Sequence, residues 1–193
     1  MAIDADYQAI PYEPLVARGM LDREAAETLQ FFRMLATEDL ARYADDPLWL
    51  ELAVEARRVA GERPEILDRT LRTRAWDAVY WLLSPNRRAE EQRDPQGLGE
   101  IAVFGAEEFP CGAKTTQGFP LRFVRPETAS TVADYVESLL PQGGGLFDAA
   151  AMEAVGVYKE PRDRDHVVGL LDRYVQLYRV AADLNECVLV ALD

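Results

Sequence analysis

The segment "ECVLVAL", residues 186–192, is the stretch that decides the fold. After Glu186 every residue in it is apolar, so a strand formed here would be apolar on both faces. A strand with one face in water alternates apolar and polar residues, whereas a strand covered on both faces reads as a continuous apolar run. The segment therefore predicts a strand that is covered by helices.

The rest of the chain alternates between helical and extended patterns. Strands are predicted at residues 6–10, 101–105 and 121–124. Helices are predicted at residues 22–42 (as one helix or a broken one), 46–61, 64–83, from 126 to the glycines at 143–145, 148–156 and 165–182. These patterns predict an α+β fold, a single domain over residues 1–193 with a small mixed or antiparallel sheet of about four short strands packed by about five to six helices.

Composition predicts a soluble globular protein. Of 193 residues, 49% are hydrophobic and 28% are charged, which suits a chain with a packed core. No apolar run reaches the length of a membrane helix, and the first residues lack the pattern of a signal peptide, so we expect a cytoplasmic protein. Cys111 and Cys187 lie far apart without metal-ligand spacing, and both are expected to be reduced thiols.

The net charge of −13 bears on the class of partner. Nucleic-acid-binding proteins carry basic groups that neutralise phosphates, and this chain is acidic overall, so no nucleic acid is expected as a partner. Seven arginines lie between Arg63 and Arg93, and we interpret them as a solvated helix flank rather than a basic binding face. The acidic balance favours a basic protein as the partner.

The loop "GAEEFPCGAKTTQG", residues 105–118, has the glycines, lysine and threonines of a phosphate-binding loop but not their spacing. A P-loop has four residues between its glycines and a lysine directly after the second. Here six residues separate Gly105 from Gly112, Ala113 stands before Lys114, and an extended segment follows in place of a helix. We expect no nucleotide or other cofactor, and we interpret the loop as a connection between strands 101–105 and 121–124.

Other catalytic candidates are isolated residues. His166, the only histidine, lies beside Asp163 and Asp165, which could ligate a metal but are also the acids that a helix N-terminus favours. We interpret them as helix-capping residues. Cys111 has no identifiable base to activate it as a nucleophile. The sequence therefore indicates no catalytic residue and no metal site, and it favours a protein without enzymatic activity.

The segment "AWDAVYWLL", residues 75–83, predicts a buried helix, because its residues are apolar or aromatic all around the helix except for Asp77. A carboxylate in apolar surroundings either has a cationic or amide partner or shifts its pKa upward. Asp77 is therefore a structural anchor or a functional group, and we favour the anchor. A candidate pocket around it consists of Trp76, Asp77, Tyr80, Arg122 and Tyr158.

Five segments in order resemble the YfbM-like family, small bacterial proteins classed as a domain of unknown function: "AWDAVYWLLSP", "GEIAVFGAEEF", "GFPLRFVRPETASTVADYVESL", "LFDAAAMEAVGVYKEP" and "RYVQLYRVAADLNECVLVALD". The resemblance implies a single α+β domain without an established activity. The family usually has a histidine where this chain has Tyr80, so a role for that histidine does not carry over. Shared chemistry would then depend on Trp76, Asp77, Gly105 and Tyr158.

Three classes of function follow from these observations. The first is a non-catalytic protein-binding module, an inhibitor or immunity-type partner that presents acidic surface to a basic target. The second is a small-ligand or enzymatic pocket around Trp76 and Tyr158. The third is a structural or self-assembly role, and the sequence leaves the oligomeric state open.

Overall fold

A computed structural model describes residues 3–84, 97–157 and 163–193. Its centre is a five-stranded antiparallel sheet in the order β2-β1-β5-β4-β3. The strands are β1 (Ala5–Pro11), β2 (Thr70–Thr73), β3 (Glu107–Glu108), β4 (Arg122–Val124) and β5 (Glu186–Leu192). The strand predicted from "ECVLVAL" is therefore the middle strand of the sheet, and the α+β fold is confirmed.

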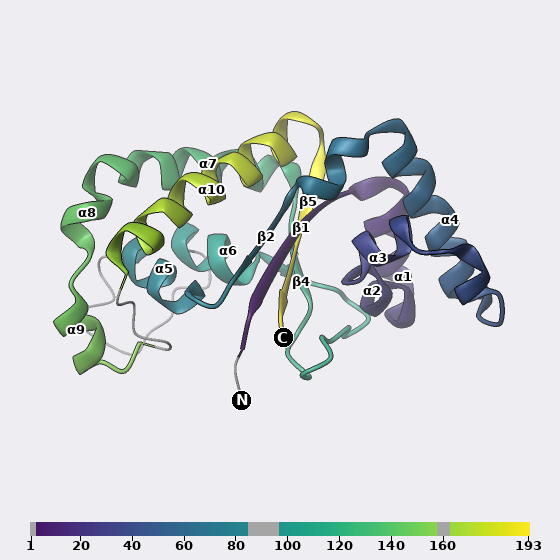
Figure 1. Ribbon diagram of the computed structural model, residues 1–193, viewed down its shortest axis with the longest axis horizontal. Coiled ribbons are helices and arrows are strands. Elements are labelled where there is room, and N and C mark those ends of the chain that lie inside the picture. Colours follow the sequence, from purple (N-terminus) through teal and green to yellow (C-terminus); the bar gives the residue numbers. More distant parts are fainter. Residues whose placement is uncertain (1–2, 85–96, 158–162) are drawn as a thin grey trace.

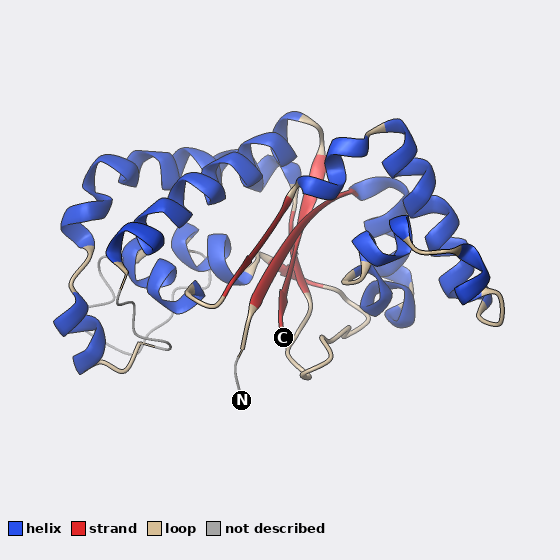
Figure 2. Ribbon diagram, viewed as in Figure 1, coloured by secondary structure: helices blue, strands red, loops and turns tan. Residues whose placement is uncertain are grey.

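Helices cover both faces of the sheet (Figures 1 and 2). One layer consists of α1 (Ala17–Leu21), α2 (Arg23–Leu29), α3 (Phe32–Thr37) and α4 (Pro47–Glu62). The other consists of α5 (Trp76–Leu83), α6 (Leu98–Phe104), α7 (Pro126–Leu139), α8 (Gly143–Leu146), α9 (Ala149–Ala154) and α10 (Arg164–Asp183). Among the described helices, none is both long enough and apolar enough to cross a bilayer.

The faces of β5 divide the core in two. Val188 and Val190 belong to the hydrophobic cluster formed with α5, α6, α7 and α10. Cys187 and Leu189 belong to the cluster formed with α1 to α4. Burial raises the pKa of the Cys187 thiol to about 12, and both described cysteines are free thiols. The continuous apolar run of β5 is thus explained by a helical layer on each side.

Glu186, the first residue of β5, is charged and also buried. Glu186 has no exposed surface, and its carboxylate accepts hydrogen bonds from the Arg69 guanidinium at 2.6 and 2.8 Å and from Arg63 at 3.0 Å. These arginines flank the 3₁₀ turn Pro64–Asp68 that precedes β2. The buried ion pairs therefore attach the start of β2 to the central strand.

Helix boundaries follow the expected capping residues. Asp46 accepts hydrogen bonds from the N–H groups of Leu48 and Trp49 at 3.1 Å, and α4 begins at Pro47 as predicted. Asp163 accepts one from the His166 N–H at 3.0 Å, which confirms the capping interpretation at α10. The segment predicted as one helix or a broken one over residues 22–42 is broken, into α2, α3 and a 3₁₀ turn over Leu40–Tyr43.

Two predicted elements are wrong. Residues 64–83 form a 3₁₀ turn, strand β2 and helix α5 rather than one helix, because the extended segment Thr70–Thr73 pairs with β1. Residues 101–104 belong to helix α6 rather than to a strand, and Gly105 follows the end of that helix. A short apolar run does not distinguish a covered strand from a buried helix, and tertiary packing decides between them.

The glycine-rich loop therefore starts after a helix. Gly105 ends α6 with a φ of 80°, and a Cβ placed on it would lie 2.8 Å from the Cβ of Arg122, so the position requires glycine. Farther along the loop, the Thr115 hydroxyl donates to the Leu192 carbonyl at 2.7 Å, and the Thr116 hydroxyl donates to Asp193. These two hydrogen bonds attach the loop to the end of β5.

Buried tyrosines hold α6 against the sheet. The Tyr178 hydroxyl donates to the Ala102 carbonyl at 2.8 Å, and the Tyr7 hydroxyl donates to the Val103 carbonyl at 2.8 Å. The Tyr174 hydroxyl donates in turn to that of Tyr7 at 2.7 Å. Carbonyls in the last turn of a helix lack partners within the helix, and here side chains from β1 and α10 supply them.

We expect Tyr178→Phe to lower the free energy of unfolding by about 1–3 kcal/mol, because the buried Ala102 carbonyl loses its donor. Tyr43→Phe is the matched control: Tyr43 is buried, but its hydroxyl lies 3.5 Å from its nearest acceptors, so the loss should be smaller. Urea denaturation measures both variants. Equal losses would contradict the role given to Tyr178.

Stability should also fall at alkaline pH. Burial raises the pKa of Tyr7, Tyr174 and Tyr178 above their ordinary value, so the folded protein keeps these hydroxyls protonated. In the unfolded chain they ionise near pH ~10. Their contribution to stability is therefore complete below about pH 10 and declines above it, by about 1.4 kcal/mol per pH unit for each tyrosine. Denaturation curves between about pH 9 and pH 11 test this, and Tyr178→Phe should flatten the decline.

Candidate functional site

The structure places four of the five predicted pocket residues, and Tyr158 lies outside the described residues. Trp76 and Tyr80 lie on α5 and both contact the ring of Phe104 on α6 edge-on, with centroid distances of 5.7 and 5.0 Å. The Trp76 indole N–H donates to the Ile3 carbonyl at 3.1 Å. These aromatic side chains pack α5 against α6 and the start of β1.

Asp77 occupies the first turn of α5 and is 9% exposed, and the residues from Ala78 to Leu83 are buried, as the sequence predicts. The partial positive charge of a helix N-terminus favours a carboxylate at this position. Arg74 precedes the helix and donates to the Asp4 carboxylate at 2.8 Å.

Arg122 lies on β4 beside Gly105, one residue from Phe104. Its guanidinium donates to the Glu108 carboxylate on the neighbouring strand at 2.6 and 3.2 Å. Arg122 is therefore close to the aromatic cluster through its backbone, while its charge is paired at the edge of the sheet.

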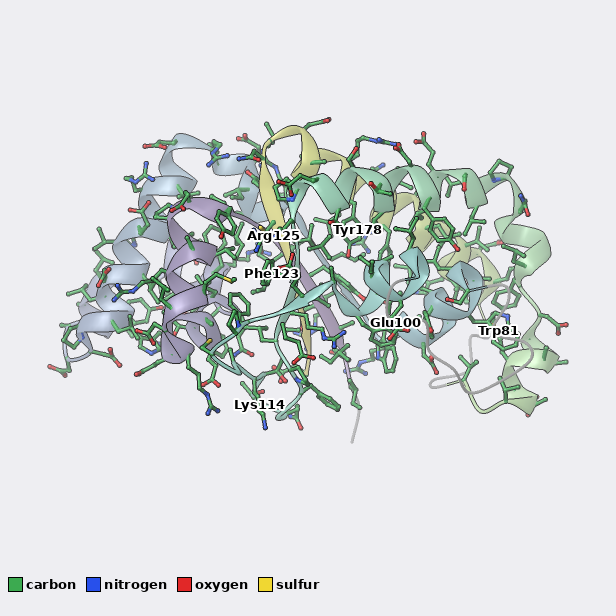
Figure 3. All side chains as sticks on the ribbon, turned by 180° about the vertical axis from the view of Figure 1, so that it is seen from behind. Trp81, Glu100, Lys114, Phe123, Arg125 and Tyr178 are labelled. Atoms are coloured by element: carbon green, nitrogen blue, oxygen red, sulfur yellow. The ribbon has the colours of Figure 1, made fainter. Side chains whose placement is uncertain are left out.

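Sequence reasoning missed a second buried carboxylate near this cluster. Glu100, in the first turn of α6, is 5% exposed, and its Oε2 atom has no hydrogen-bond partner. Figure 3 shows Glu100 in the same helical layer as Trp81 and Tyr178, away from Phe123 and Arg125 on the sheet side. The sequence predicts a strand at residues 101–105, and that prediction places Glu100 before a strand and not on a buried helix.

A hollow lies away from this aromatic cluster, along the edge strand β2. It has a volume of about 710 Å³ and extends from α3 across β1 and β2 to α10. We call it the β2 trough; its polar lining includes Asp6, Gln8, Arg33, Thr70, Arg72 and Arg173. Its walls come from segments that are distant in the sequence, so no sequence motif predicts it.

Electrostatic interactions in the trough centre on Arg72. Its guanidinium donates to Asp4 at 2.7 and 3.0 Å and lies 3.6 Å from Asp6. Hydrogen bonding to Arg72 lowers the pKa of Asp4, while burial raises the pKa of Asp6 despite the nearby arginine. The trough thus presents a carboxylate of raised pKa next to arginine side chains, a lining suited to hydrogen bonding and ion pairing.

A third feature is an aromatic stack on the outer helical layer. The ring of Trp49 lies between Phe31 and Tyr43, with centroid distances of 5.7 and 5.9 Å. Phe31 and Trp49 are half-buried and border a hollow of about 460 Å³ that Glu24, Glu27, Arg23 and Lys114 also line. We call this surface the Trp49 face: Phe31, Trp49, Glu24, Glu27 and the exposed acids Asp39 and Asp45 of the segment that carries Tyr43.

Searches against family models, curated proteins and solved structures gave no match to this chain. Within the described ranges 3–84, 97–157 and 163–193, no three or more histidine, cysteine or acidic side chains gather as metal ligands would.

Substitutions of Asp77 and Glu100, the two buried carboxylates near the aromatic cluster, should change the free energy of unfolding in opposite directions. Asp77→Ala should lower the free energy of unfolding by about 1–3 kcal/mol, because a structural anchor is removed from the first turn of α5. Glu100→Gln should raise it by about 1 kcal/mol, because burying a charge with an unpartnered oxygen costs more than the helix dipole returns.

Denaturant unfolding of Asp77→Ala, Asp77→Asn and Glu100→Gln measures these effects. If both Asp77 variants unfold at the same or higher denaturant concentration than the parent protein, the anchor interpretation is wrong. Asp77 would then be the starting point of a search for a ligand, since removing a functional carboxylate often stabilises a fold.

Proposed function

We propose that this chain is a non-catalytic protein-binding module, an inhibitor or immunity-type partner that presents acidic surface to a basic target protein. The observation that carries the proposal is the Trp49 face. Tryptophan and tyrosine are enriched among the residues that contribute most to binding at protein interfaces. Here a half-buried tryptophan stacks between two aromatic rings and borders a hollow that two acidic and two basic side chains line.

Charge supports the same proposal. Asp39 and Asp45 are exposed, and neither forms an ion pair within the part of the chain that the structure describes. With a net charge of −13, the chain attracts basic proteins over distances comparable to the Debye length. We infer that the partner is basic and that electrostatic attraction accelerates its binding.

We propose a cytoplasmic location, with which the free thiols of Cys111 and Cys187 are consistent. We also propose, from the five segments that resemble it, that the chain belongs to the YfbM-like family. A small-ligand site is the second candidate function, and the β2 trough favours it, because its volume of about 710 Å³ lies within the range of small-molecule sites.

A pull-down from lysate of the cells that make this protein tests the module. We expect a basic protein to be retained at low salt and released steeply towards physiological salt, because screening weakens attraction between surface charges. Trp49→Ala should weaken binding of that protein by about 2 kcal/mol, roughly thirtyfold, with Asp39→Asn and Asp45→Asn reducing mainly the association rate.

The control is Trp49→Phe, which keeps an aromatic ring in the stack and should retain most of the affinity. Circular dichroism verifies that each variant is folded. Retention that does not depend on salt, or that Trp49→Ala leaves unchanged, would count against the module. Stabilisation by a metabolite in a thermal-shift screen would instead favour the small-ligand site.

A further inference from the structure

β2 is an edge strand whose outer backbone groups are open. It pairs with β1 alone, with Leu71 opposite Tyr7 and Thr73 opposite Ala5. The Ala9 N–H donates to the Arg69 carbonyl at 3.0 Å. In an antiparallel pair, hydrogen-bonded residues alternate with residues that face away, so Arg69, Leu71 and Thr73 bond to β1.

It follows that the N–H and C=O groups of Thr70 and Arg72 point outward. Within the described residues, neither group has a backbone partner on that side. Figure 1 shows β2 at the near edge of the sheet, between α10 and the helices α1 to α4. Such an edge is a template for one more strand.

Hollows lie on both sides of this edge. The β2 trough lies on the side of α3, and a smaller hollow of about 270 Å³ lies on the side of α10. Thr70 and Arg173 line both. Because side chains of a strand alternate between the two faces of a sheet, an added strand would direct them alternately into the two hollows.

The lining of these hollows differs in charge from the rest of the chain. Four arginines, Arg33, Arg69, Arg72 and Arg173, face three aspartates, Asp6, Asp68 and Asp193. Arg33 and Arg173 are exposed, and neither forms an ion pair with a carboxylate within residues 3–84, 97–157 and 163–193. These two arginines can form ion pairs with an acidic occupant.

We propose that β2 binds an extended acidic segment of a partner protein, which adds to the sheet as a sixth strand through the outward groups of Thr70 and Arg72. Its acidic side chains pair with Arg33 and Arg173. A second copy of this chain fits less well, because pairing of two β2 edges would place their arginine side chains together. The proposal goes beyond the function proposed above, because it requires neither Trp49 nor a basic partner.

Amide chemical-shift mapping by NMR tests the proposal on the full chain. The probe is a blocked heptapeptide of alternating valine and glutamate, titrated to millimolar concentration. We expect saturable shifts that are largest at the amides of Thr70 and Arg72. A peptide with lysine in place of glutamate should bind at least tenfold more weakly, and a peptide N-methylated at alternate residues should not bind, because it lacks the donors that β2 requires.

Matched variants separate the charge contribution from loss of structure. The double variant Arg33→Gln and Arg173→Gln should weaken binding of the acidic peptide at least tenfold. Arg18→Gln, which removes another exposed arginine away from β2, should leave it unchanged. Absence of shifts at Thr70 and Arg72, or equal binding of the N-methylated or lysine peptide, overturns the proposal. Shifts of these amides with protein concentration alone also overturn it, because the occupant would then be a second copy.

Discussion

Burial of β5 on both faces is the constraint on which the rest of the structure depends. Because Val188 and Val190 need one apolar layer and Cys187 and Leu189 need another, helices must pack on both sides of the sheet. The strand starts with a buried carboxylate, which would be costly without its ion pairs to Arg63 and Arg69. Because Glu186 needs these ion pairs, β5 also constrains the segment before β2, which carries both arginines.

The need to give buried polar groups hydrogen-bond partners also explains how α6 is held in place. A helix that ends inside the core leaves carbonyl groups that water cannot reach, and this cost must be met by other side chains. The hydroxyls of Tyr7 and Tyr178 meet it from a strand and a helix that are distant in the sequence. Each hydroxyl thus joins α6 to another element, and the helical layer is fixed to the sheet by polar contacts as well as by apolar packing.

The sequence predicted the elements whose signals are local. Asp46 with Pro47 and Asp163 mark helix starts that the structure confirms, because capping depends on groups within one turn. β5 was also predicted correctly, from a run that is apolar on both faces. Residues 64–83 and 101–105 were not, because the pairing of β2 with β1 and the tyrosine contacts to α6 involve partners tens of residues away.

The candidate sites also differ in whether a local sequence signal or long-range packing creates them. Asp77 was recognisable as one acid in an apolar helix, whereas the β2 trough arises only when α3, β2 and α10 come together. The trough exists because residues 70–73 form a short strand where helical periodicity predicted a continuous helix. Glu186 binds the side chain of Arg69, the residue directly before that strand, while backbone pairing with β1 sets which backbone groups of β2 face outward. The buried carboxylate at the start of the central strand is thereby linked to the segment that leads into the open edge.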